Sequence, residues 1–413
     1  MKFVHAADLH LDSPLKGLAD YPGAPVEAVR GATRQAFEAL IELCVAETVD
    51  LLVIAGDVFD GDWKDFSTGL YFRSQLARLR EENIEVVMIR GNHDAASVVT
   101  RNLSLPDIHV LPHTKPGRVV LENVGAVVHG QSFATRAVTE NLAARYPAPI
   151  RDMVNIGVLH TCLGGYVAHE SYAPCALEEL VARGYDYWAL GHVHERAVLH
   201  TDPHVVFAGN LQGRQIREPG AKGATVVEIA DGEIRLTGHA LDCVRWDRVR
   251  VDAGGASDDV EVLERSQAAL EGALAAADGR LLAGRIEIAG VTTAHAALVR
   301  ERERLEAELR ALATDMGSEQ VWLERIVWDT ALPRSGASDD AVGETIKVLR
   351  RAAADPAALA ALAQRLQPLA LKLPADVKAG RDGVNPADPE TLARVLGEVE
   401  GSLPSMLTEG RAA

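Results

Sequence analysis

The sequence predicts an α/β fold for the first half of this chain, and three observations lead to that prediction. Short runs rich in Val, Ile and Leu recur along residues 1–210. They lack the strict alternation of half-exposed strands, so they indicate strands buried on both faces. Helix-like stretches separate the first three runs, and polar residues directly follow several of them. Because ligands gather at the carboxyl ends of strands in layered α/β proteins, these polar residues are candidates for a functional site.

Six apolar runs are the expected strands of this region, and three longer stretches are its expected helices. The strands are Phe3–Ala6, Leu51–Ala55, Val86–Ile89, Ile156–Leu159, Trp188–Leu190 and Val205–Ala208. The helices are Val26–Glu47, Phe66–Glu82 and Ala176–Arg183. Over residues 223–240, two alternating runs flank Asp231-Gly232, which is typical of a β-hairpin. This hairpin would close a first domain of residues 1–243.

The pattern of residues 244–332 predicts a small βαβαβ module. That of residues 333–413 predicts a linker followed by helices. The expected strands of the module are Val244–Val251, Arg280–Ile288 and Val321–Trp328, and its helices are Val260–Ala277 and Ala294–Thr314. Residues 333–338 have the composition of a linker. The Ala- and Leu-rich helices expected at 339–371 and 389–400 contain no plausible chemistry. We therefore expect them to pack or to dock a partner.

The composition sets limits on the class of protein. With 413 residues, 47% hydrophobic and 24% charged, the chain can bury a large core and divide into more than one domain. No apolar run reaches the roughly 18 residues that a membrane span needs, so we expect a cytoplasmic protein without a membrane partner. The four cysteines are widely spaced and are expected to be reduced thiols. A net charge of −17 argues against a strongly basic nucleic-acid binder, although local arginine placement matters more than the sum.

Five polar motifs follow the apolar runs in one order along the chain. They are Asp8-Leu9-His10, Gly56-Asp57-Val58-Phe59-Asp60, Gly91-Asn92-His93-Asp94, His160 and Gly191-His192-Val193-His194. Carboxylate, amide and imidazole groups suit Mn, Fe or Zn, and a paired set can hold two ions about 3.5–4 Å apart across a phosphate. A single histidine in a strand is usually structural, but five such motifs at strand ends are hard to explain by chance. The pattern predicts a two-metal phosphoesterase.

The place of each residue in these motifs indicates which ion it would hold. Asp57 follows a glycine that ends a strand, and we expect its two carboxylate oxygens to bridge the ions. Two residues that are two positions apart on an extended strand end project to the same side, as Asp8 and His10 would. The two expected sets are therefore Asp8, His10 and His194 for one ion, and Asn92, His160 and His192 for the other.

His93 is the expected general acid. If its neighbour Asn92 binds metal, the His93 ring can face the substrate and protonate the alkoxide that leaves a phosphodiester. Asp60 could orient His93 and keep it charged, whereas Asp94 could orient it or serve only as a local turn carboxylate. The attacking group would be a metal-bound hydroxide, because the ions lower the pKa of coordinated water.

These residues resemble the calcineurin-like metallophosphoesterase superfamily, which shares their order along the chain. Within it, residues 7–18 are similar to the opening of the SbcD- and YhaO-type DNA-repair exonucleases, and more to the YhaO type. Residues 209–214, continuing through Glu218, Gly220 and Lys222-Gly223, are similar to a further stretch of that subfamily. The resemblance implies a two-sheet αββα sandwich with a small βαβαβ capping domain and a helical C-terminal tail.

The resemblance also implies an activity and partners. We expect a manganese-dependent exonuclease or endonuclease on DNA that acts as a homodimer with a coiled-coil ATPase of the SbcC type. Carried over by motif, the seven ligands and the acid His93 are all present. Arg90, Arg214 and Lys222 fall in loops near the motifs and would clamp phosphate or be ordinary surface cations. Trp63 could stack on a base or pack a loop.

Two other functions share some of these features. A phosphodiesterase or pyrophosphatase acting on a small nucleotide would use the same metals, and the metal site cannot separate it from a nuclease. The module after residue 243 favours DNA, since a small substrate needs no extended capping surface. In a third reading the chain is a scaffold for an ATPase subunit, with the tail as its docking arm. An intact general acid argues against that reading, because a scaffold has no need of His93.

Overall fold

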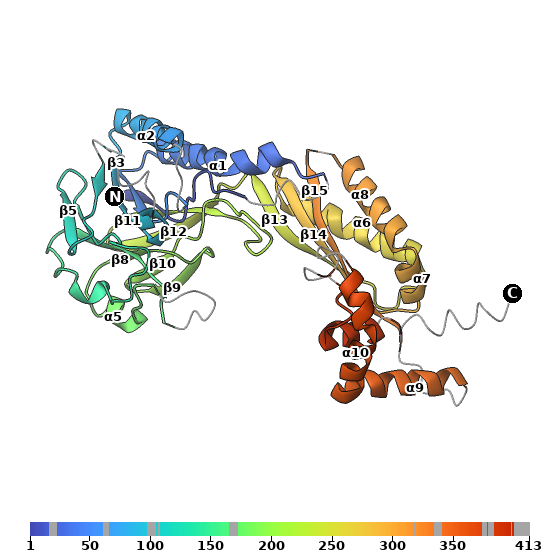
Figure 1. The fold of residues 1–413 in the computed structure, drawn as a ribbon. Coiled ribbons are helices and arrows are strands. Elements are labelled where there is room, and N and C mark those ends of the chain that lie inside the picture. Colours follow the sequence, from blue (N-terminus) through green and yellow to red (C-terminus); the bar gives the residue numbers. More distant parts are fainter. Residues whose placement is uncertain are drawn as a thin grey trace. The chain divides into compact units, whose positions relative to one another are not determined.

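The computed structural model shows an α/β protein with three β-sheets (Figure 1). It describes residues 1–15, 23–60, 66–96, 105, 108–164, 172–317, 319–333, 341–373, 378, 384–397 and 399. Two compact units are present: residues 1–248, 273–285 and 316–324 form the first, and residues 249–272, 286–315 and the described residues from 325 onward form the second. The domain boundaries at residues 243 and 332 stay a prediction.

Two six-stranded sheets form the first unit, as the αββα prediction requires. In spatial order, sheet one comprises β12 (Glu233–Ala240), β11 (Gly223–Ala230), β1 (Lys2–Ala6), β2 (Leu51–Ala55), β3 (Glu85–Ile89) and β4 (His109–Val110). Sheet two comprises β5 (Gly117–Leu121), β6 (Ala126–Gly130), β7 (Val154–His160), β8 (Tyr187–Gly191), β10 (His204–Phe207) and β9 (Ala197–Thr201). The central strands β1–β2–β3 and β6–β7–β8–β10 run parallel within their sheets.

The strands are apolar on both faces because each sheet is covered on both sides. In β1, Phe3 packs into the core between the sheets, together with Ile156 of β7. The next residue, Val4, packs on the opposite face against Phe37 of α1 (Val26–Ala46). Buried residues of α1 recur every three or four positions, which gives the helix one apolar face toward this sheet.

The remaining helices of the first unit cover the sheets or connect strands. They are α2 (Phe66–Glu81), α3 (Asn92–Ala96), the short 3-10 helix η2 (Ala143–Arg145) and α5 (Leu177–Val181). The β11–β12 hairpin turns at Asp231-Gly232, where both residues have the positive φ that a two-residue hairpin turn requires. Strands β4, β5, β6 and β9 were not predicted from the sequence.

The third sheet follows the predicted βαβαβ order. It comprises β13 (Val244–Asp252), β14 (Leu281–Val291) and β15 (Val321–Ala331). Helix α6 (Asp259–Ala276) connects the first two strands, and α7 (His295–Arg300) and α8 (Arg302–Asp315) connect the last two. One helix was predicted over 294–314, and it is interrupted at Glu301, which caps α7 outside helical geometry.

Two further helices, α9 (Ala341–Ala354) and α10 (Pro356–Lys372), lie in the C-terminal region. Asp355 caps α10 by accepting a hydrogen bond from Ala357 N, and Pro356 occupies the first helical position. The predicted linker lies outside the described residues, apart from its first residue, Pro333. Among the helices that the structure describes, none is both long and apolar enough to cross a membrane.

Candidate metal centre and active site

The loops after β1 and β2 lie against each other at the carboxyl ends of these parallel strands. Asp8 N donates to Gly56 O at 3.0 Å, and His10 N donates to Asp57 O at 3.0 Å. Asp8, His10 and Asp57 all have positive φ, between 44° and 53°. Such backbone is uncommon for residues other than glycine and clusters at functional sites. Here it accompanies the side chains that the motifs single out.

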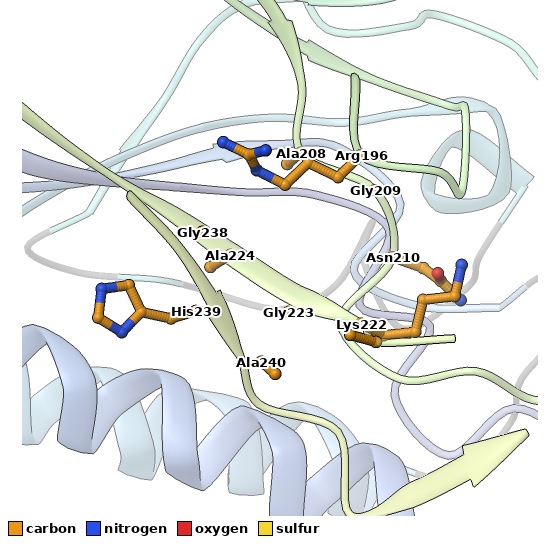
Figure 2. Close-up of a pocket in the computed structure, with 11 residues that line it drawn as sticks. Arg196, Ala208, Gly209, Asn210, Lys222, Gly223, Ala224, Gly238, His239 and Ala240 are labelled. Atoms are coloured by element: carbon orange, nitrogen blue, oxygen red, sulfur yellow. The ribbon is translucent and has the colours of Figure 1, made fainter. Parts of the chain in front are cut away.

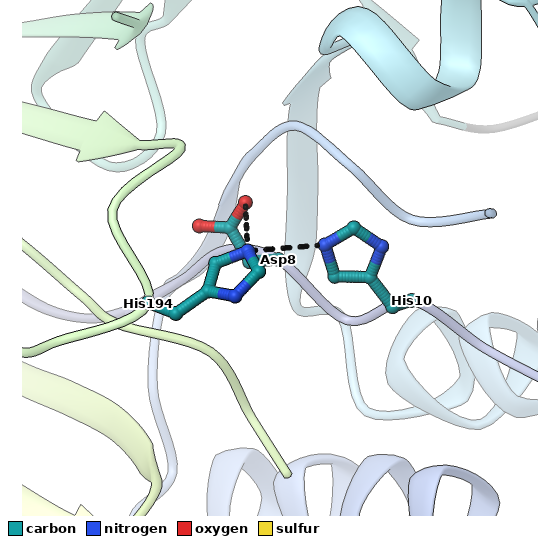
Figure 3. Close-up of side chains that lie close together, drawn as sticks. All are labelled: Asp8, His10 and His194. Carbon is teal, nitrogen blue, oxygen red and sulfur yellow. Dashed lines mark hydrogen bonds and ion pairs between the residues drawn. The ribbon is translucent and has the colours of Figure 1, made fainter. Parts of the chain in front are cut away.

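Asp8, His10 and His194 form the first group of potential ligands (Figure 3). The Nε2 atoms of His10 and His194 are 3.3 Å apart, and Asp8 Oδ1 lies 3.8 Å from His194 Nε2. His194 Nδ1 lies 2.8 Å from Glu218 Oε1, so this carboxylate sets the ring orientation and leaves Nε2 facing the group. The structure therefore brings together the three residues expected around one ion.

A second group gathers around His160. Its Nε2 lies 3.3 Å from Asp57 Oδ2 and 2.9 Å from Asn92 Oδ1, while Nδ1 lies 2.9 Å from Ala55 O. The ring of His192 is 5.2 Å from that of His160. Asp57 Oδ2 is also 4.0 Å from His10 Nε2, so this carboxylate lies between the two groups. That is the position expected of a bridging ligand.

Burial makes this collection of charges costly unless a cation joins it. Asp8, His10, Asp57 and His160 are at most 1% exposed. Burial raises the pKa of Asp8 and lowers that of His10. Burial also opposes charge on His160, but the negative charges of Asp57 and Asp8 outweigh it and raise the pKa of His160 to about 9.

The donor set fits two divalent cations. Two imidazole Nε2 atoms converge at 3.3 Å beside two buried carboxylates, and an amide oxygen completes the second group. Carboxylate, amide and imidazole together are the donors that first-row divalent metals take. The residues that would hold these ions are the seven singled out from the sequence: Asp8, His10, Asp57, Asn92, His160, His192 and His194.

His93 stands next to these groups and is held by Asp60. His93 Nδ1 lies 2.6 Å from Asp60 Oδ1, and the ring lies edge-on to His10 with centroids 5.0 Å apart. Burial disfavours charge on His93, but its hydrogen bond to Asp60 and the nearby negative charges give a net rise in its pKa. His10, Asp60 and His93 also lie close enough to hold an ion, although the short Nδ1–Oδ1 distance is that of a hydrogen bond.

Asp94 has a structural position, which was one of its two expected roles. Its carboxylate is fully buried and accepts hydrogen bonds from the backbone N–H groups of Val58, Phe59 and Gly91. It therefore ties the loop after β2 to the loop after β3. No interaction of its carboxylate with His93 is present among the described residues.

Arg214 lies between the two carboxylates that orient the histidines. Its Nη1 is 3.3 Å from Asp60 Oδ2, and its Nη2 is 3.2 Å from Glu218 Oε1. Ser13 Oγ donates a further hydrogen bond to Asp60 Oδ2 at 2.5 Å. Glu218 lies in a stretch that resembles the subfamily, but the sequence predicts no role for it, because a loop carboxylate 24 residues after His194 has no recognisable spacing. That Arg214 clamps phosphate stays a prediction.

The other two predicted phosphate clamps have different surroundings. Lys222 is buried, and its Nζ donates to His194 O at 2.7 Å. Arg90 follows β3, and its backbone N donates to Ser132 Oγ at 2.9 Å. Both lie beside the candidate ligands in the chain or in space, and their contact with a substrate stays a prediction. Trp63 lies outside the described residues.

The fold and this donor set together define a metal-dependent phosphoesterase. Residues 1–196 match the family described as calcineurin-like phosphoesterase, so this part of the chain is a calcineurin-like metallophosphoesterase domain. Residues 246–331 match the family described as the middle domain of the metallophosphoesterase YhaO.

Curated relatives agree with this placement. The chain is 36% identical over 257 residues to the "Uncharacterized metallophosphoesterase YhaO" of Bacillus subtilis, covering 61% of this chain and 63% of that one. It is 31% identical over 219 residues to the DNA double-strand break repair protein Mre11 of Methanopyrus kandleri, covering 47% and 44%. It is 35% identical over 99 residues to a subunit of the nuclease SbcCD of Rhodobacter capsulatus, covering 23% and 22%. The matches thus span less than two thirds of each relative's length.

Proposed function

We propose that this metallophosphoesterase is a manganese-dependent DNA exonuclease or endonuclease that acts in DNA repair. The observation that carries the proposal is the His93–Asp60 pair beside the two ligand groups, with 2.6 Å between Nδ1 and Oδ1. A phosphodiester has an alkoxide leaving group that needs a proton, so a poised imidazole suits a diester. Relatives named for DNA double-strand break repair and nuclease activity support DNA as the substrate.

The residues of the site would divide the work between binding and proton transfer. Two divalent cations, when bound by the seven ligands, would neutralise the phosphate and supply a nucleophile at neutral pH. Asp60 holds His93 by Nδ1, which leaves Nε2 as the nitrogen that can donate a proton to the leaving oxygen. Glu218 fixes the tautomer of His194 in the same way, and Arg214 offsets the charge of both carboxylates.

A phosphodiesterase or pyrophosphatase for small nucleotides is the second candidate. The ligand groups would serve it equally well. The match of residues 246–331 to the YhaO middle domain favours the nuclease, since it supplies protein surface beyond the site. The manganese-loaded chain should be incubated with labelled single- and double-stranded DNA and with cyclic nucleotides. Turnover of the small molecules alone would reject the nuclease proposal.

Partners follow from the same proposal. We infer a cytoplasmic homodimer with a coiled-coil ATPase of the SbcC type, for which α9 and α10 would be the docking arm. Val348, Leu369 and Leu371 on these helices are between 49% and 79% exposed, and the first unit has a complete core without them. Truncation at Gly336 should leave hydrolysis intact and abolish ATPase binding in a pull-down. A truncated chain that still binds the ATPase would remove the tail from this role.

A further inference from the structure

A small pocket adjoins the candidate metal centre without containing any of its predicted ligands (Figure 2). Its volume is about 200 Å³, far more than the roughly 10–15 Å³ that one water needs. Lys222 and Asn210 of its lining connect it to the centre. Lys222 Nζ donates to His194 O, and Asn210 Nδ2 donates to Glu218 Oε2 at 3.1 Å. A molecule in this pocket would therefore lie next to the His194 side of the site.

Two cations of this pocket have no ion pair among the residues that the structure describes. Lys222 is buried, with one of its three N–H groups engaged by His194 O, and no carboxylate of the described residues lies within 4.0 Å of its Nζ. Arg196 Nε donates to Thr225 Oγ1 at 2.9 Å, and its terminal nitrogens make no hydrogen bond within the described parts of the chain. Arg34, Arg214, Arg245 and Arg280, by contrast, are all paired with carboxylates.

The neighbouring acids already have other partners. Glu218 is engaged by Arg214 and His194, and Asp242 by Arg245 and Arg280. Glu195 is exposed and is the remaining acid whose charge acts on Lys222. In a chain of net charge −17, the buried Lys222 and the exposed Arg196 thus place two cations without an ion pair to any described residue in one pocket, where an anion can reach both.

The β11–β12 hairpin leaves room for the Arg196 side chain, and Thr225 Oγ1 on this hairpin accepts a hydrogen bond from Arg196 Nε. Gly238 lies opposite Thr225 in the β11–β12 ladder, and Figure 2 shows the guanidinium extending over this part of the hairpin. A Cβ on Gly238 would lie 3.2 Å from Arg196 Nε and 3.4 Å from its Cζ, so a side chain there would crowd the guanidinium. Because only Nε of Arg196 is engaged by the described residues, its two terminal nitrogens can contact a ligand.

We propose that this pocket binds a phosphate of the substrate strand other than the one that is hydrolysed. A guanidinium with a free edge beside an ammonium is the pairing that recognises phosphate oxygens. The inference rests on the proposed nuclease function and deepens it. A substrate with several phosphates in series would occupy the metal centre and this pocket together, whereas a small diester would leave the pocket unused.

The test compares the full-length manganese-loaded protein with Arg196→Gln on two substrates, a labelled oligonucleotide and bis(4-nitrophenyl) phosphate, which carries a single phosphate. The advantage of the oligonucleotide is its kcat/KM divided by that of the single-phosphate diester. Loss of one charge-assisted contact should lower this ratio about 10-fold. Arg235→Gln is the matched control, because Arg235 is an exposed arginine that lies on β12 near the hairpin turn and does not line the pocket. It should leave that advantage within twofold of the wild type.

The outcomes separate the inference from the proposed function. An equal loss on both substrates, or an unchanged advantage in Arg196→Gln, would overturn the phosphate pocket while leaving the nuclease intact. A wild-type protein that hydrolyses only the single-phosphate diester would overturn the nuclease and the pocket with it. Added inorganic phosphate should compete with the strand for the pocket, so it should inhibit oligonucleotide hydrolysis more in the wild type than in Arg196→Gln. Equal inhibition of the two proteins would contradict a phosphate pocket at Arg196.

Discussion

At the scale of single residues, the site depends on pairs in which a carboxylate orients an imidazole. Asp60 holds His93 and Glu218 holds His194, each through Nδ1 at 2.6 and 2.8 Å. In the proposed function, the first pair would set up the proton donor and the second a metal ligand. Because both carboxylates also contact Arg214, the donor and the ligand share one supporting residue.

Replacing His93 should separate proton donation from metal binding. His93→Ala should lower the rate of diester hydrolysis by roughly 10²–10⁴. Metal content measured by elemental analysis should stay near the wild-type value, because the predicted ligands remain. His295→Ala, in the second unit, serves as a histidine control with unchanged rate. Unchanged activity in His93→Ala would show that another group is the proton donor.

Arg214 should affect both metal affinity and turnover. In Arg214→Gln, Asp60 and Glu218 lose the cation between them, so both histidines should be held less firmly. Loss of a group behind the ligands typically costs roughly 10–100-fold in metal affinity or activity. Titration calorimetry with Mn²⁺ and the steady-state rate measure the two effects. Arg214→Lys should recover only part of the loss, since one ammonium cannot bridge two carboxylates as a guanidinium fork does.

A further prediction concerns how stability depends on pH. His5 is buried in β1 with Nδ1 3.0 Å from the Tyr187 hydroxyl, and burial lowers its pKa to about 3. The unfolded chain binds a proton at His5 below its ordinary pKa near 6.5 and the folded chain does not. This contribution to the free energy of unfolding is therefore complete above pH 6.5 and is lost as pH falls toward 3.

His5→Gln should remove that acid sensitivity. Between pH 6.5 and 5, the wild type should lose about 2 kcal/mol more unfolding free energy than the variant, measured in urea. The comparison cancels the titration of other groups. Equal losses in the two proteins would mean that His5 is protonated in the folded state.

At the scale of elements, the strand ends of the site approach so closely that two positions, Gly191 and Gly91, have no room for a side chain. A Cβ at Gly191, the last residue of β8, would lie 2.1 Å from Ala55 O and 2.9 Å from His160 Nδ1. A Cβ at Gly91 would lie 2.2 Å from Asp57 Oδ1. Each glycine therefore lets a ligand of a neighbouring strand reach the centre.

Gly191→Ala should damage both stability and metal binding. The extra methyl group should push β8 away from the end of β2 and displace His160, at a cost of about 1–3 kcal/mol for overpacking. Gly31→Ala is the matched control, because Gly31 lies inside α1 with its nearest neighbour at 3.7 Å. That change should stabilise by about 0.5–1 kcal/mol. Thermal unfolding and Mn²⁺ titration distinguish the two variants, and a Gly191→Ala protein with normal affinity would refute this account.

At the scale of the whole molecule, metal binding and folding should be linked. Ligands drawn from five loops meet in the folded chain, and burial raises the pKa of Asp8 without a cation. Mn²⁺ at 100 times its Kd should stabilise the protein by about 2.7 kcal/mol for each bound ion, and chelation should reverse the gain. Calorimetry of the full chain with Mn²⁺ or EDTA measures this shift. In Asp57→Asn the shift should fall sharply, and its persistence would exclude Asp57 as a ligand.

Local patterns in the sequence were enough to predict the layered fold and to single out the ligand candidates. Apolar runs of three to five residues marked the buried strands. The carboxyl ends of parallel strands necessarily meet at one edge. The half-polar pattern of β5 and β9 was too weak to predict strands, because edge positions carry little hydrophobic signal.

The support around the ligands came only from the tertiary structure. Glu218, Arg214 and the Arg196 pocket depend on loops far apart in the chain meeting in space, and no local spacing encodes such meetings. The role of Asp94 was also decided by packing, because its three backbone donors come from two different loops. Residue type and strand order thus determined which groups could bind metal. Three-dimensional packing decided which groups orient them, because a hydrogen bond depends on the distance between two atoms and not on their separation in the sequence.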